Sequence, residues 1–165
     1  MSIFSAVFSR SAGGWWGAEA EVAQAGGIDD IADLMRDVVA AHDPDAAEGT
    51  MVLMLEADDE WFAVVRVDDH GDPRVFLSDV RVVHEHPVAE ILLDTGTIQA
   101  PEQAEGTGQK PYPVPGGDDS LLADLGIPAT ELVELTLSEG LLPGDVLDEL
   151  SERAGFAERL DALRL

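Results

Sequence analysis

The feature that most constrains the fold is a pair of apolar runs in the middle of the chain, at residues 51–55 and 61–67. The first run reads MVLML without a polar residue, which is typical of a strand that is buried on both faces. In the second run, WFAVVRV, alternate residues place Trp61 on one face and Phe62 on the other, so both faces are again apolar. The two runs therefore predict central strands of a sheet whose faces are covered.

Further strands and helices are predicted from periodicity and turn residues. Residues 3–9 and 15–22 predict a hairpin that opens the chain, and residues 74–78 predict a last strand. Apolar residues recur at helical spacing over residues 28–41, and a proline opens a second helix over residues 87–94. The order ββαβββα predicts an α+β fold with one mostly antiparallel five-stranded sheet and helices on one face.

The composition changes near residue 100, where APEQAEGTGQKPYPVPGG is rich in proline, glycine and polar residues. We predict a sheet domain over residues 1–94, a flexible linker over residues 95–117, and a small C-terminal helical unit over residues 118–165. The C-terminal helices are short, so we expect them to dock on the sheet domain, on each other or on a partner.

The charge balance is strongly acidic: 34 acidic residues stand against 9 basic ones, giving a net charge of -25. Such a field repels phosphate backbones, so we predict no direct binding to nucleic acid. It would attract a basic protein face or divalent cations, although the solubility of an acidic cytoplasmic protein is an alternative explanation. No apolar stretch reaches the roughly 20 residues of a membrane span, and the N-terminus does not resemble a signal peptide, so we predict a cytoplasmic location.

The sequence shows no recognisable catalytic machinery. The chain has no cysteine, which removes thiolate catalysis and thiolate metal sites. His84 and His86 would share a face in an extended segment, but Pro87 follows at once and no third histidine is near. Ser78 and Asp79 lie close to His84 in sequence, which is no signature of a triad because triads are assembled in space. We therefore predict no catalytic residues, no metal and no cofactor.

Two interpretations remain open for the aromatic and arginine residues of the strands. They are core strands with charged ends, in which Arg66 and Arg74 pair with Asp68, Asp69 or Asp72, or they contribute to a docking surface. Tryptophan and arginine are the residues most often found as interface anchors. We expect one of the two adjacent tryptophans of the first hairpin to face solvent, a partner or the C-terminal unit. The candidate partner-binding residues are Trp61, Arg66, Arg74, Phe76, Ser78, Asp79, Trp15 and Trp16.

Three stretches together resemble a known family: DEWFAVVRVD at residues 59–68, PRVFLSD at residues 73–79, and LLADLGIPATELVELTLSEGLLPGDVLDELSERAGF at residues 121–156. With them the chain resembles the actinobacterial tRNA adenosine deaminase-associated proteins over residues 3–164. The resemblance implies an association with the tRNA-editing adenosine deaminase. It implies no enzymatic role and no catalytic residue.

Three hypotheses of function follow. The first is a non-catalytic accessory or regulatory partner of the deaminase, because an acidic chain suits the basic face of a tRNA-binding enzyme. The second is an enzyme that uses carboxylates and a divalent cation, which predicts a concave cluster of acidic side chains with raised pKa values. The third is a self-associating module, in which exposed sheet edges pair across a dimer.

Overall fold

The chain folds as an α+β structure in a computed structural model. The structure describes residues 3–11, 14–22, 25–44, 49–57, 60–68, 73–80, 87–92, 115–138 and 140–164.

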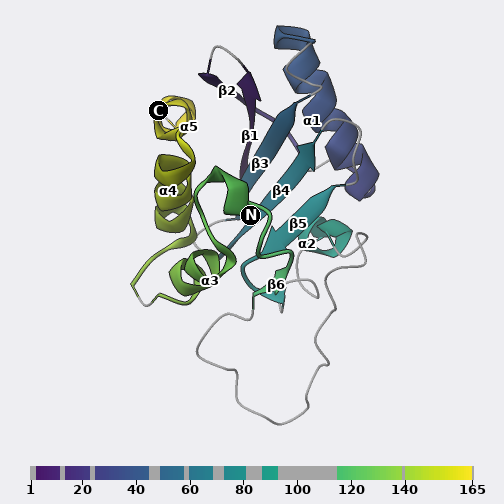
Figure 1. Cartoon of the computed structure of the whole chain (residues 1–165). Helices are drawn as coiled ribbons and strands as arrows, with labels where there is room; N and C mark the ends of the chain where they lie inside the picture. Colours follow the sequence, from purple (N-terminus) through teal and green to yellow (C-terminus); the bar gives the residue numbers. More distant parts are fainter. Residues whose placement is uncertain are drawn as a thin grey trace.

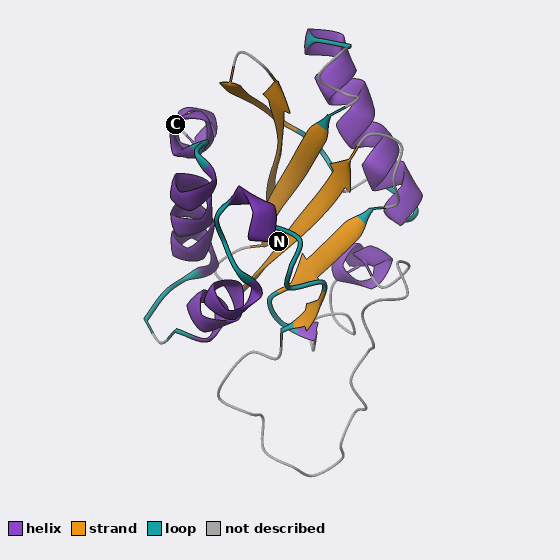
Figure 2. Ribbon diagram, in the orientation of Figure 1, coloured by secondary structure: helices purple, strands orange, loops and turns teal. Residues whose placement is uncertain are grey.

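Six strands form one antiparallel, open sheet (Figure 1, Figure 2). The strands are β1 (Ile3–Ser11), β2 (Gly14–Glu19), β3 (Thr50–Ala57), β4 (Trp61–Asp68), β5 (Arg74–Leu77) and β6 (Gly116–Gly117). Their order across the sheet is β2-β1-β3-β4-β5-β6. The sheet is thus a hairpin joined to a meander, with the apolar strands β3 and β4 at its centre.

Two helices cover the first face of the sheet. They are α1 (Ile28–His42) and α2 (Pro87–Leu92), which lie to the right of the sheet in Figure 1. The apolar face of α1 packs on alternate residues of the strands, including Leu53 of β3 and Val65 of β4, and Ala89 and Leu92 of α2 join the same core. This arrangement is the one that the helical period of residues 28–41 predicts.

The C-terminal helices cover the second face. They are a 3-10 turn, η4 (Ala123–Leu125), and the helices α3 (Ala129–Leu137), α4 (Pro143–Ala154) and α5 (Ala157–Arg164). In Figure 2 these helices lie on the opposite side of the orange sheet from α1. Leu147 and Leu150 of α4 share a core with Val52 of β3 and Phe62 of β4, the side chains that alternate with those of the first core.

The sequence prediction of an α+β fold with a largely antiparallel sheet is confirmed, with two corrections. The sheet has six strands and not five, because Gly116 and Gly117 pair with Phe76 and Leu77 at the edge. Glycine is unfavourable in strands, so a two-residue strand at the end of a Pro/Gly-rich segment gives no sequence signal. Helices cover both faces and not one, because the apolar residues on both sides of β3 and β4 need cover, and the C-terminal helices provide it.

The division at residues 94 and 117 stays a prediction. Most of the predicted linker lies outside the described residues, and Gly116 and Gly117 at its end form β6. The backbone N–H of Asp118 donates to the carbonyl oxygen of Val75 at 2.8 Å, so the helical unit begins in direct contact with the sheet. None of the helices in the described ranges is long and apolar enough to cross a membrane.

Candidate functional site

Most of the predicted partner-binding residues are buried within the chain. Trp61 packs in the first core and Phe76 in the second. The Ser78 hydroxyl accepts a hydrogen bond from the backbone N–H of Phe62 at 2.9 Å, which closes the end of the β4–β5 pair. Asp79 follows it and is also buried. The burial favours the interpretation as core strands with charged ends, and a partner-binding role for these four residues stays a prediction.

The two adjacent tryptophans lie on opposite faces of β2. Trp16 packs against the first core and stacks on His42, with ring centroids 4.2 Å apart and planes 3° apart. Trp15 packs against Phe156 of the C-terminal unit, with ring centroids 4.8 Å apart. The contact of Trp15 with the C-terminal unit is one of the three environments expected for this pair.

Arg66 makes several polar contacts within the chain, and only 4% of its surface is exposed. Its Nε donates to both carboxylate oxygens of Asp68 at 3.1 Å, and its Nη1 donates to the carbonyl oxygen of Leu121 at 2.7 Å. The same guanidinium holds Asp124 through two parallel hydrogen bonds, of which the bond from Nη2 measures 2.8 Å. Such bidentate pairs combine energy with a fixed geometry. Arg66 therefore joins β4 to the η4 turn.

Arg74 makes a second bridge from the sheet. It pairs in register with Arg66 on the neighbouring strand, and its Nε donates to the Asp118 carboxylate at 2.6 Å. The Ser120 backbone N–H and hydroxyl both donate to the other oxygen of Asp118, at 3.0 Å and 2.6 Å. We call Arg66, Arg74, Asp118 and Asp124 the arginine clamp. It fixes the start of the C-terminal unit on the second face of the sheet.

Sequence reasoning found only part of the clamp. The pairing of Arg66 with Asp68 is confirmed, whereas Asp69 and Asp72 lie outside the described residues. The other carboxylates come from 44 and 58 residues further along the chain. No local spacing could have identified Asp118 and Asp124 among 34 acidic residues.

The clamp predicts a specific dependence of stability on pH. The hydrogen bond from Arg66 holds the pKa of Asp124 below its ordinary value of 3.8. Burial raises the pKa of Asp118, but hydrogen bonds from Arg74 and Ser120 outweigh it and leave that pKa lowered. A carboxyl whose pKa is lower in the folded chain stabilises the fold when ionised. This contribution is present above the unfolded pKa and is lost as the pH falls through the folded pKa.

We therefore expect the Asp124→Asn variant to be less stable than the wild type at neutral pH, and the difference to shrink as the pH falls from about 5 towards 2. Urea denaturation at several pH values measures both chains. The comparison with the variant is needed because protonating the other carboxylates also relieves the repulsion within a chain of charge -25. A difference that stays constant over this range would contradict the clamp.

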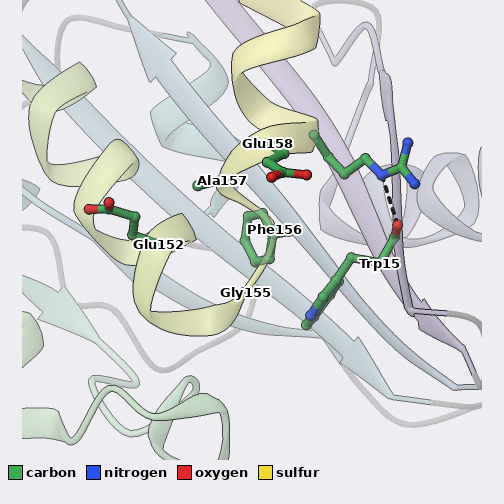
Figure 3. A pocket seen from close by; sticks show the side chains of 7 residues that line it. Trp15, Glu152, Gly155, Phe156, Ala157 and Glu158 are labelled. Atoms are coloured by element: carbon green, nitrogen blue, oxygen red, sulfur yellow. Dashed lines mark hydrogen bonds between the residues drawn. The ribbon is translucent and has the colours of Figure 1, made fainter.

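A shallow hollow lies where β2 meets the junction of α4 and α5 (Figure 3). It has a volume of about 350 Å³ and is lined by Trp15, Glu152, Gly155, Phe156, Ala157, Glu158 and Arg159. Arg159 donates from Nε to the carbonyl oxygen of Trp15 at 3.0 Å, drawn as the dashed line in Figure 3. Two carboxylates, of Glu152 and Glu158, and one guanidinium, of Arg159, therefore line the same hollow.

A group of exposed leucines lies at the connection between α3 and α4. Leu137 is 39% exposed, Leu141 is 42% exposed and Leu142 is 50% exposed. They are the large apolar side chains with the greatest exposure in the described part of the chain. The sequence analysis did not single out these leucines, although a leucine pair between a glycine and a proline is visible in the sequence.

The prediction that the chain holds no metal stays a prediction. Among the described residues, no group of three or more His, Asp and Glu side chains could hold a metal ion. His84, Glu85 and His86 lie outside the described residues.

The comparisons with known proteins identify the family. A protein-family model described as "Rv3753c-like tRNA adenosine deaminase-associated protein" matches residues 3–157. The chain belongs to this family. It is 30% identical over 116 residues to "Protein Rv3753c" of Mycobacterium tuberculosis (strain ATCC 25618 / H37Rv), a match that covers 70% of this chain and 64% of that protein. No solved structure matches the chain.

The three stretches that carry the family resemblance meet in the fold. The first contains β4, the second contains β5, and the third runs from η4 through α4 to Phe156. Phe62, Phe76 and Leu147, one from each stretch, share the second core. The arginine clamp also links the first stretch to the third through Arg66 and Asp124. The family pattern thus coincides with the packing of the C-terminal unit on the sheet.

Proposed function

We propose that this chain is a non-catalytic accessory or regulatory protein that binds tRNA adenosine deaminase through protein–protein contacts. The observation that carries the proposal is the match of residues 3–157 to a family described as associated with that enzyme. The family description names an association with the enzyme, and we propose that this association is a direct physical contact.

The charge of the chain supports a partner with a basic face. An enzyme that edits tRNA binds a polyanion and must present basic residues to it. This chain carries a net charge of -25 and would be attracted to the same residues. The two could therefore compete for one surface of the deaminase.

The described arginines are engaged in contacts within the chain, and the carboxylates far outnumber them. All six arginines with described side chains contact groups of this chain. Arg36, Arg66, Arg74 and Arg153 form ion pairs with carboxylates, Arg159 donates to a backbone carbonyl, and Arg10 lies 5.9 Å from the centre of the Trp15 ring. The many remaining carboxylates set the sign of the potential.

The directions of two carboxylate pKa shifts assign Asp118 and Asp124 a structural role. A general acid among the carboxylates would need a raised pKa to hold its proton near neutral pH. Asp118 and Asp124 have lowered pKa values, because arginines bind their ionised forms. These two carboxylates therefore act in the structure as anchors.

Co-purification with the tRNA adenosine deaminase of the same organism tests the proposal. A tagged copy of this chain should retain the purified deaminase at low ionic strength and release part of it at high ionic strength, because exposed charges are screened by salt. Added tRNA should also release the enzyme if both bind its basic face. Absence of any association at low ionic strength would overturn the proposal.

A further inference from the structure

The leucine surface, which we define as Leu137, Leu141 and Leu142, combines exposure with a fixed backbone. Leu137 ends α3, and the other two residues come directly before α4. Gly140 adopts a φ of 83°, which favours glycine, and Pro143 occupies the first turn of α4. The Asp145 carboxylate accepts the backbone N–H of Leu142 at 3.0 Å. These features define the backbone of Leu141 and Leu142 at the start of α4 before any partner binds.

Leu142 stands at a position where leucine is unfavourable. It is the N-cap residue of α4, where Ser, Thr, Asp or Asn would accept a hydrogen bond from the first turn. The leucine side chain makes no such bond and half of its surface is exposed. A local choice that lowers stability is expected mainly at functional sites.

The stretch of sequence that contains the leucine surface, from the start of α3 to the end of α4, is acidic. Residues 129–154 contain seven carboxylates and one arginine, a net charge of -6. That arginine, Arg153, binds Glu149 with its Nε at 3.0 Å and also contacts Glu131. Glu134 lies one turn before Leu137 on α3 and is exposed. The leucines thus form an apolar spot within an acidic field.

We propose that the leucine surface is the docking site for an apolar spot within the basic face of the tRNA adenosine deaminase. This inference rests on the proposed function and assigns the contact to particular residues. Apolar side chains that exclude water supply affinity that persists in salt, while the carboxylates around them attract the basic face.

The charge selects this partner over other occupants. A second copy of the chain would bring one acidic field against another, and like charges in contact cost free energy. RNA and anionic lipid surfaces are negative as well and would be repelled. A protein face that is basic and contains apolar side chains satisfies both properties of the surface.

Binding of the full chain to the purified deaminase, measured by calorimetry at low and high salt, tests the site. We expect the double variant Leu141→Ser, Leu142→Ser to weaken binding by at least about tenfold at both salt concentrations. Its melting temperature should be equal to that of the wild type or higher, because serine is a better N-cap residue. The matched control, Leu141→Met with Leu142→Met, keeps the apolar area and should bind within about threefold of the wild type.

The possible results distinguish a wrong docking site from a wrong proposed function. If the serine variant binds as tightly as the wild type, the docking site is wrong and the proposed function stands. If the wild type itself does not bind the deaminase, both are wrong. Light scattering of the chain alone covers the remaining occupant: a dimer that the serine variant converts to a monomer would assign the leucine surface to a second copy and overturn the inference.

Discussion

Replacing Phe156 with alanine should lower the free energy of unfolding by about 3–5 kcal/mol. The ring is almost fully buried and lies between two aromatic side chains of the first hairpin: it stacks on Phe8 at 4.4 Å and contacts Trp15 at 4.8 Å. Phe8 in turn lies over Gly17, where the absence of a side chain leaves room for its ring. Phe156 therefore connects the end of α4 to the outer strands, and its loss leaves a cavity between helix and sheet.

Urea denaturation followed by circular dichroism measures this effect. The matched control is Leu137→Ala, an equally apolar residue of the same helical unit that is 39% exposed, for which we expect a loss of less than about 1 kcal/mol. Equal stability of the Phe156→Ala variant and the wild type would mean that the C-terminal helices do not pack on the sheet in solution.

The Arg66→Ala variant should be destabilised by about 2–4 kcal/mol. The substitution leaves the carbonyl of Leu121 without its donor and removes the bidentate contact with Asp124. The full cost of breaking a buried pair is not expected, because the side chains of Asp68 and Asp124 are exposed enough to be hydrated once the arginine is gone. Arg66→Lys should recover only part of the loss, since an ammonium group cannot form the parallel pair of hydrogen bonds.

The control for the arginine clamp is Arg153→Ala. Arg153 also contacts two carboxylates, but on the surface of α3 and α4, where solvent screens the pairs, so we expect its loss to destabilise the chain much less than the loss of Arg66. The denaturation midpoints of the two variants give the comparison directly. Equal losses for Arg66→Ala and Arg153→Ala would show that burial of the guanidinium adds nothing and would contradict the role given to the clamp.

Much of the fold could be predicted because the relevant signals are local. The alternation of Trp61 and Phe62 predicted apolar groups on both faces of β4, and the two residues do lie in different cores. The spacing of Ile31 and Met35 predicted α1, which buries both. The same alternation implied that helices cover both faces of the sheet, but we predicted helices on one face only.

The contacts that complete the site are not local. The pairing of Gly116 with Leu77 depends on the sheet edge, and the pairing of Asp124 with Arg66 depends on where the C-terminal unit docks. Neither position has a periodicity or a turn residue that marks its partner. The leucine surface is different, since Leu141 and Leu142 were visible in the sequence, but their exposure is set by the turn at Gly140.

The net charge of the chain indicates a basic partner, and the family match names one. A net charge of -25 predicts attraction to any basic protein, so charge alone does not select the deaminase. The family match names that enzyme, and the leucine surface supplies a contact that would distinguish it from other basic proteins.

The dissociation constant of the complex between this chain and the tRNA adenosine deaminase, measured from about 50 mM to about 500 mM salt, tests the central claim most directly. We predict measurable binding at the lowest salt, a dissociation constant that rises with salt as the charges are screened, and a residual affinity at the highest salt that comes from apolar contacts. Absence of a complex at the lowest salt would contradict the claim.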